Sequence, residues 1–173
     1  MDMSRVRILT IALGALVPLA IVSARPALAQ DDQESVSGHV EFINAIGNHI
    51  RYSIHAVRHR DGSVSGEGEE HAETPAGDFV RRTHVTVVCF TVAGNVARIG
   101  VVVDQTRGAG LPPGTEGFLT VVDNGEGHEA PPDMASVGVA GPPGSAQAHC
   151  DRGLPRPLFP IDAGNIQVRP AGL

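Results

Sequence analysis

From residue 36 onward, hydrophobic and polar residues alternate with a period of two, in short segments separated by Gly, Pro, Asn and Asp. This pattern is typical of half-buried β-strands joined by turns. The expected strands cover residues 36–42, 49–57, 64–70, 83–92, 96–103, 118–123, 134–140 and 166–169. We find no helical period of 3.6 here, so the prediction is an all-β fold, a single antiparallel β-sandwich or small β-barrel of seven to eight strands.

Two hairpins have a predictable register. In the first, pairing Phe42 with Ile50 also sets Glu41 opposite Arg51, so that apolar meets apolar and acid meets base. In the second, a turn at 93–95 with Val92 opposite Val96 gathers six side chains on one face: Val85, Val87, Cys89, Ile99, Val101 and Val103. The Gly-rich segment 64–70 is expected at a sheet edge, because glycine weakens a strand interior.

The first 29 residues have the pattern of a secretory signal peptide. Arg5 and Arg7 precede an apolar run over 8–22, and Ala27 and Ala29 supply the small residues of a cleavage site before Gln30. A transmembrane anchor is the alternative, but the run is shorter than the roughly 20 residues that span a bilayer. We therefore expect an exported protein, secreted or periplasmic.

The remainder divides into a flexible polar leader (30–35) and a single β domain (36–173). Within that domain, the Pro-rich stretch 141–160 is predicted to be a loop without regular structure. A chain of this length can bury a core of its own, so no second domain is required.

Charge excludes two classes of partner. Three of the 13 basic residues and one of the 19 acidic residues precede residue 30, so the formal net charge changes from −6 to −8 after cleavage. The remaining basic residues do not cluster, which argues against nucleic acid and anionic membrane as partners. No stable membrane insertion is expected after cleavage, and the expected partner is an unknown protein or small ligand.

Cys89 and Cys150 are the only cysteines. In an oxidising compartment an even number of cysteines predicts a disulfide, here between these two residues. Because Cys89 falls on the predicted apolar face, the bridge would hold the Pro-rich loop over one end of the core. Two unpaired thiols are the alternative.

Two groups of residues are candidate metal ligands. Asp123, Glu126 and Asp133 offer oxygen atoms of the kind that calcium prefers, although the spacing is not that of an EF-hand and an Asn-Gly turn explains the segment equally. His39 and His55 fall on one outer face of the first hairpin as diagonal neighbours, which is compatible with zinc or with a solvated surface. No cofactor is expected.

Catalytic patterns are missing from the sequence. The segment 62–66 reads Gly-Ser-Val-Ser-Gly, which places Val64 where a nucleophilic serine would stand. No catalytic residue is therefore assigned. Carboxylate pairs of the kind that glycosidases use are defined by their separation in space, so the sequence alone leaves them open.

The segments 88–97 (Val-Cys-Phe-Thr-Val-Ala-Gly-Asn-Val-Ala), 121–127 (Val-Val-Asp-Asn-Gly-Glu-Gly) and 131–133 (Pro-Pro-Asp) resemble those of uncharacterised secreted bacterial β-rich proteins. The resemblance implies export and a β-rich fold, and it brings no known activity. Three functions remain: a non-catalytic interaction or ligand-binding module, which we expect first; a secreted hydrolase that uses carboxylates or His; and a weak calcium- or zinc-binding protein.

Overall fold

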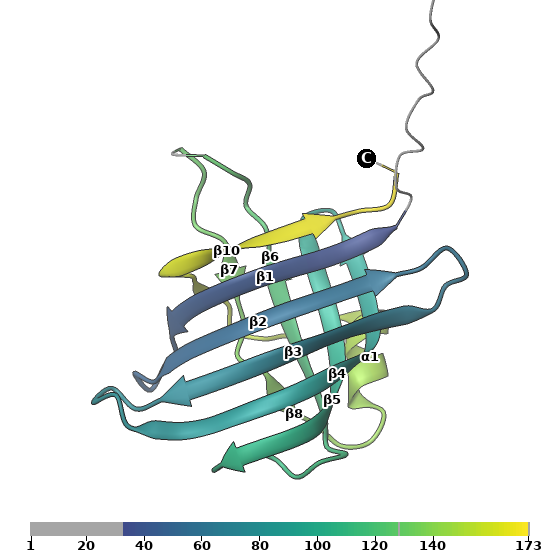
Figure 1. Cartoon of the computed structure of the whole chain (residues 1–173). Helices are drawn as coiled ribbons and strands as arrows, with labels where there is room; N and C mark the ends of the chain where they lie inside the picture. Colours follow the sequence, from purple (N-terminus) through teal and green to yellow (C-terminus); the bar gives the residue numbers. More distant parts are fainter. Residues whose placement is uncertain (1–32, 128, 173) are drawn as a thin grey trace, which may run out of the picture.

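The computed structural model describes residues 33–127 and 129–172, which form one antiparallel sheet and one short helix (Figure 1). The predicted signal peptide lies outside the described residues. The elements are β1 (Glu34–Ile43), β2 (His49–Arg58), β3 (Val64–Glu73), β4 (Phe79–Ala93), β5 (Val96–Gly108), β6 (Glu116–Val122), β7 (Met134–Ala135), β8 (Val139–Ala140), α1 (Ser145–Arg152), β9 (Phe159–Pro160) and β10 (Ala163–Arg169).

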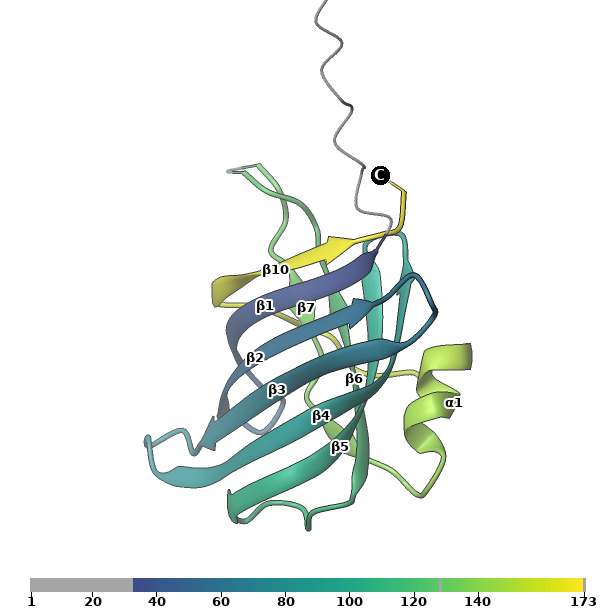
Figure 2. The same cartoon turned by 45° about the vertical axis from the view of Figure 1, so that its right-hand side comes forward.

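The sheet is curled into a half-barrel, and its strand order is β10-β1-β2-β3-β4-β5-β6-β7-β9, with β8 also paired to β6. Figure 2 shows the curl from the side, with α1 outside the sheet. The all-β prediction is confirmed, and the architecture is barrel-like. β10 pairs with β1, so the C-terminal strand lies beside the first strand of the domain.

The register of the first hairpin is confirmed. Phe42 pairs with Ile50 and Glu41 with Arg51, as the alternation predicts. The inner apolar side chains of both strands are buried in the core, whereas most outer ones are polar, with Ile43 and Val57 as exceptions. β1 begins at Glu34, inside the predicted leader, and the Glu34 carboxylate accepts a hydrogen bond of 2.9 Å from Arg58.

The prediction that the Gly-rich segment forms an edge strand is wrong. β3 lies in the middle of the sheet, between β2 and β4. Gly68 faces the inside of the half-barrel, where an added Cβ would lie 2.7 Å from Ile54 Cδ1 and 3.3 Å from Val85 Cγ2. A side chain at this position would have to displace Ile54, because side chains of the neighbouring strands cover the β3 backbone.

The second hairpin follows the predicted register in only part of its length. Val85 pairs with Val103 and Val87 with Val101, as predicted, but Val88 forms a β-bulge. Beyond the bulge the pairing shifts by one residue, so Cys89 pairs with Gly100 and faces α1 on the outside of the sheet. Cys89 is therefore not on the inner apolar face where the sequence placed it.

The predicted Pro-rich loop contains α1, so the expectation of no regular structure over 141–160 is wrong. The helix packs against β4, β5 and β6 from outside (Figure 2). Its first turn is capped by the Glu116 carboxylate, which accepts hydrogen bonds from the N–H groups of Gly144 (2.9 Å) and Ala146 (3.0 Å). These bonds lower the pKa of Glu116, since they favour its ionised form.

Candidate ligand-binding cavity

A cavity of about 300 Å³ lies on the concave side of the half-barrel. We call it the inner cavity. Its apolar wall comes mainly from strands β2, β4, β5 and β6 and from the short β8, and it includes Ile54, Val85, Val101, Val103, Leu119 and Val139. All of these side chains except Val139, which pairs with Phe118, stand on the inner face of a curled strand, where alternation directs every second residue.

The mouth of the inner cavity is formed by the segments that follow β5 and precede β8. Three residues of these segments and one residue of β8 line the cavity and are themselves exposed: Ala109, Leu111 and Gly138, and Ala140 of β8. Leu111 is 38% exposed, which is unusual for a large apolar residue that also lines a cavity. The inner cavity therefore opens to solvent between two irregular segments.

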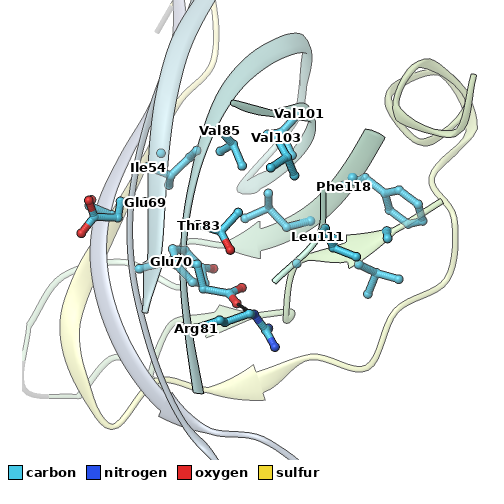
Figure 3. Close-up of a pocket in the computed structure, with 18 of the residues that line it drawn as sticks. Ile54, Glu69, Glu70, Arg81, Thr83, Val85, Val101, Val103, Leu111 and Phe118 are labelled. Atoms are coloured by element: carbon cyan, nitrogen blue, oxygen red, sulfur yellow. Dashed lines mark hydrogen bonds and ion pairs between the residues drawn. The ribbon is translucent and has the colours of Figure 1, made fainter. Parts of the chain in front are cut away.

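Two charged residues stand beside this mouth, since a Cβ added to Gly138 would lie 3.2 Å from Glu70 Oε2. Figure 3 shows Glu70 and Arg81 together at one end, away from Val101 and Val103. Arg81 donates two hydrogen bonds to Glu70 Oε1, one from Nε at 2.7 Å and one from Nη2. The pair is partly buried, with side-chain exposures of 15% for Glu70 and 27% for Arg81. The mutual neutralisation lets two charges lie beside an apolar wall.

Tyr52 is the neighbour of this pair. It lies directly opposite Glu70 in the β2–β3 ladder, on the same face of β2 as Ile54, and it is 5% exposed. Its hydroxyl is buried and has no hydrogen-bond partner among the described residues. Burial raises the pKa of Tyr52 well above its usual value, and the negative charge of Glu70 adds to the effect.

Sequence reasoning missed this polar end, because Tyr52 falls inside the expected strand 49–57 and no role was assigned to it, to Glu70 or to Arg81. A signal was present in the alternation. Arg81 is in phase with the inward-facing Val85 and Val87, so a charge stands on the apolar face of β4. Charged residues at inward positions of two paired strands indicate either an internal ion pair or a binding site.

The three predicted calcium ligands are brought to one strand, β10, where each accepts a hydrogen bond. Asp133 Oδ2 binds the Ile166 N–H and Asp123 Oδ2 binds the Val168 N–H, both at 2.9 Å, and Glu126 Oε1 binds the Asn165 side chain at 2.8 Å. The second oxygen of Asp133 accepts from the Asn124 N–H. In this arrangement the carboxylates satisfy the N–H groups of a sheet edge.

His39 and His55 are diagonal neighbours, as predicted, since His39 pairs with Ser53 and His55 with Ser37. Both are exposed on the outer face. Over residues 33–127 and 129–172, no group of three or more His, Cys, Asp or Glu side chains is placed so as to hold a metal ion. Metal binding stays a prediction without support from this part of the chain.

The predicted disulfide is present, with the sulfur atoms of Cys89 and Cys150 2.04 Å apart. It attaches α1 to the outside of β4. Next to it, an added Cβ on Gly100 would overlap the Cys89 sulfur and lie 2.9 Å from Ala146 Cβ, so the helix rests directly on the strand backbone. The disulfide is compatible with an extracellular or periplasmic protein.

Fold and cavity together define a class: an all-β, disulfide-bonded half-barrel with an apolar cavity that ends in a buried polar group. No model of a known protein family, no curated protein and no solved structure matches the chain. Among the described residues, no helix has the length and apolar character needed to cross a membrane.

Proposed function

We propose that this protein is an exported, non-catalytic binding domain that holds a small apolar molecule in the inner cavity. The observation that carries the proposal is the combination of a solvent-connected apolar cavity with a few polar groups at one end. Small-molecule sites in proteins have this composition, and their volumes begin near 300 Å³. A molecule of one to three rings, or a short branched chain, has the right size.

Packing supports this reading. Protein interiors are normally filled, and side chains beside a void lose dispersion contacts. Here Val85 remains partly exposed on an inner face. An apolar ligand would restore those contacts and remove apolar surface from water.

Binding is better supported than hydrolysis by the polar groups of the inner cavity. Glu69 also borders it, but Figure 3 shows that its carboxylate points away, and it pairs with Arg82 and His84. The Glu70 carboxylate is held by Arg81. Hydrolysis of the glycosidase type requires a second carboxyl group that faces the first across the substrate.

The signal-peptide pattern in the sequence and the disulfide support a location outside the cytoplasm, secreted or periplasmic. In that setting an apolar small molecule is poorly soluble, and a domain that covers it would keep it in solution. The formal charge of −8 after the predicted cleavage keeps such a carrier soluble.

Titration with the neutral dye N-phenyl-1-naphthylamine tests the proposal. Tyr52 is the only tyrosine and the chain has no tryptophan, so its intrinsic emission reports on the inner cavity alone. We expect saturable binding of one dye per chain, quenching of the Tyr52 emission, and a melting temperature that rises with dye concentration. The absence of all three effects would refute the proposal.

A matched pair of variants locates the dye. Val85→Phe places a larger side chain in the inner cavity, and Val88→Phe makes the same change at an exposed bulge outside it. We expect Val85→Phe to abolish dye binding and Val88→Phe to leave it intact. Circular dichroism of both variants checks that the sheet is kept, and equal dye binding by the two would place the dye elsewhere.

A further inference from the structure

At the Glu70 end of the inner cavity the protein has one hydrogen-bond donor and one acceptor that are not paired with each other. The donor is the Tyr52 hydroxyl, which is buried without a partner among the described residues. A buried hydroxyl without a partner is costly, so natural structures seldom keep one without a reason. It is the first indication that a ligand group completes this site.

The acceptor is Glu70 Oε2. Both hydrogen bonds from Arg81 end on the other oxygen, Oε1. Oε2 lies close to Gly138, which also lines the cavity. A Cβ added to Gly138 would lie 3.2 Å from Oε2. A side chain at position 138 would therefore cover the oxygen, and glycine leaves it accessible.

We infer, on the basis of the binding function proposed above, that the ligand is an uncharged apolar alcohol or phenol, whose hydroxyl oxygen accepts from Tyr52 and whose hydroxyl hydrogen is donated to Glu70 Oε2. One hydroxyl group can satisfy both the Tyr52 hydroxyl and Glu70 Oε2, because its oxygen accepts a hydrogen bond while its hydrogen is donated. The apolar remainder of the molecule lies along Val85, Val101 and Val103.

Other polar groups fit less well. A ketone or ether accepts from Tyr52 but leaves Glu70 Oε2 without a donor. A carboxylate would bring a second negative charge to Glu70, while Arg81 already donates to that residue. Desolvating an additional, unpaired charge in an apolar cavity is strongly unfavourable.

Three probes with one ring system separate these possibilities: 2-naphthol donates and accepts, 2-methoxynaphthalene only accepts, and 2-naphthoate is an anion. Calorimetric titration at neutral pH compares their affinities for the wild-type protein. We expect 2-naphthol to bind about tenfold more tightly than 2-methoxynaphthalene, the factor that one typical hydrogen bond supplies. The anion is expected to bind weakest.

Variants assign the preference to residues. Tyr52→Phe is expected to weaken 2-naphthol and 2-methoxynaphthalene alike, because both lose the same donor. Glu70→Gln is expected to reduce the advantage of 2-naphthol over 2-methoxynaphthalene. The control is Glu69→Gln, the neighbouring carboxylate on the outer face, which is expected to leave that advantage unchanged.

The outcomes separate the two proposals. If the naphthylamine dye binds in the inner cavity but the alcohol has no advantage, the inference about the ligand is wrong and the binding function stands. Tightest binding of 2-naphthoate would likewise overturn it, in favour of an anion recognised by Arg81. If neither the dye nor any of the three probes binds, both proposals fail.

Discussion

Asp133 and Ile166 are 33 positions apart in the chain, and the carboxylate of the first accepts the backbone N–H of the second at 2.9 Å. Asp123 binds Val168 of the same strand in the same way. β10 is the first strand of the sheet, and these N–H groups point away from β1, its partner among the described strands. Side-chain carboxylates thus occupy the edge where a further strand would otherwise pair.

Replacing the buried carboxylate should therefore weaken the fold. In Asp133→Asn, the amide nitrogen faces a backbone N–H that the lost oxygen had bound, so one donor is left unsatisfied. We expect a loss of about 3 kcal/mol in the free energy of unfolding, since hydrogen bonds to charged groups contribute about 1.5–3 kcal/mol and an unsatisfied donor adds to the cost. Urea denaturation measures the change.

Glu126→Gln is the control for that variant. Glu126 is exposed and binds the Asn165 side chain at the same strand. Its replacement is expected to change the free energy of unfolding by less than about 0.5 kcal/mol. Equal losses in the two variants would contradict the assignment of Asp133 as the residue that seals the edge.

The disulfide gives a second prediction. Cys89 and Cys150 are 61 positions apart, and a link across a loop of that length stabilises the native state by roughly 4 kcal/mol in the chain-entropy model. The double variant Cys89→Ala and Cys150→Ala should lose about that amount in urea denaturation. Reduction of the wild-type protein with dithiothreitol should give a similar loss. A change below about 1 kcal/mol in both would show that α1 stays docked without the bridge.

Local alternation predicted the register of the first hairpin because Phe42 and Ile50 are close in sequence and face the same core. It failed for Cys89, since one bulge at Val88 exchanges the faces of the strand and leaves no mark in the pattern. α1 was missed because its cap, Glu116, comes from another element, β6. Short helices stabilised by distant partners carry little signal of their own.

The candidate site was less predictable than the fold. The acidic segment that suggested calcium proved to bind β10, and a pairing between Asp133 and Ile166 cannot be read from local spacing. Glu70 and Arg81 could have been found, because both are in phase with inward-facing positions of their strands. The inner cavity itself depends on how far the sheet curls, which the strand pattern does not specify.

Tyr52 provides a prediction that separates stability from function. Tyr52→Phe removes a buried hydroxyl that has no partner and keeps the ring, which packs edge-on against Phe42 at a centroid distance of 6.0 Å. We expect the ligand-free variant to be as stable as the wild type or more stable, by up to about 1 kcal/mol. Thermal and urea denaturation without ligand measure this.

Tyr52→Leu is the companion variant, because it removes the ring as well as the hydroxyl and should destabilise the protein. If Tyr52→Phe lost as much stability as Tyr52→Leu, the hydroxyl would have a structural partner in solution. The argument that it is kept for a ligand would then be lost.

His149 leads to a prediction about the stability of the Pro-rich segment in acid. It is fully buried on α1, its Nδ1 accepts the Leu154 N–H at 3.1 Å, and its Nε2 lies 3.1 Å from the Leu119 carbonyl oxygen. With Nδ1 as an acceptor, the ring is neutral and donates from Nε2. Desolvation lowers the pKa of His149 below its usual value near 6.5.

A histidine with a lowered pKa in the folded state binds protons less readily there than in the unfolded chain. Its contribution to stability is complete above the unfolded pKa and is lost as the pH falls through the lowered folded pKa. We therefore expect the melting temperature of the wild type to fall between pH 7.5 and pH 5. The variant His149→Gln cannot titrate, so its melting temperature should fall less over the same range, while exposed His39→Gln should follow the wild type. Protonation of Nδ1 would remove the acceptor of the Leu154 N–H, which is the expected cause of the loss. Parallel melting curves for all three proteins would rule out His149 as the source of the acid sensitivity.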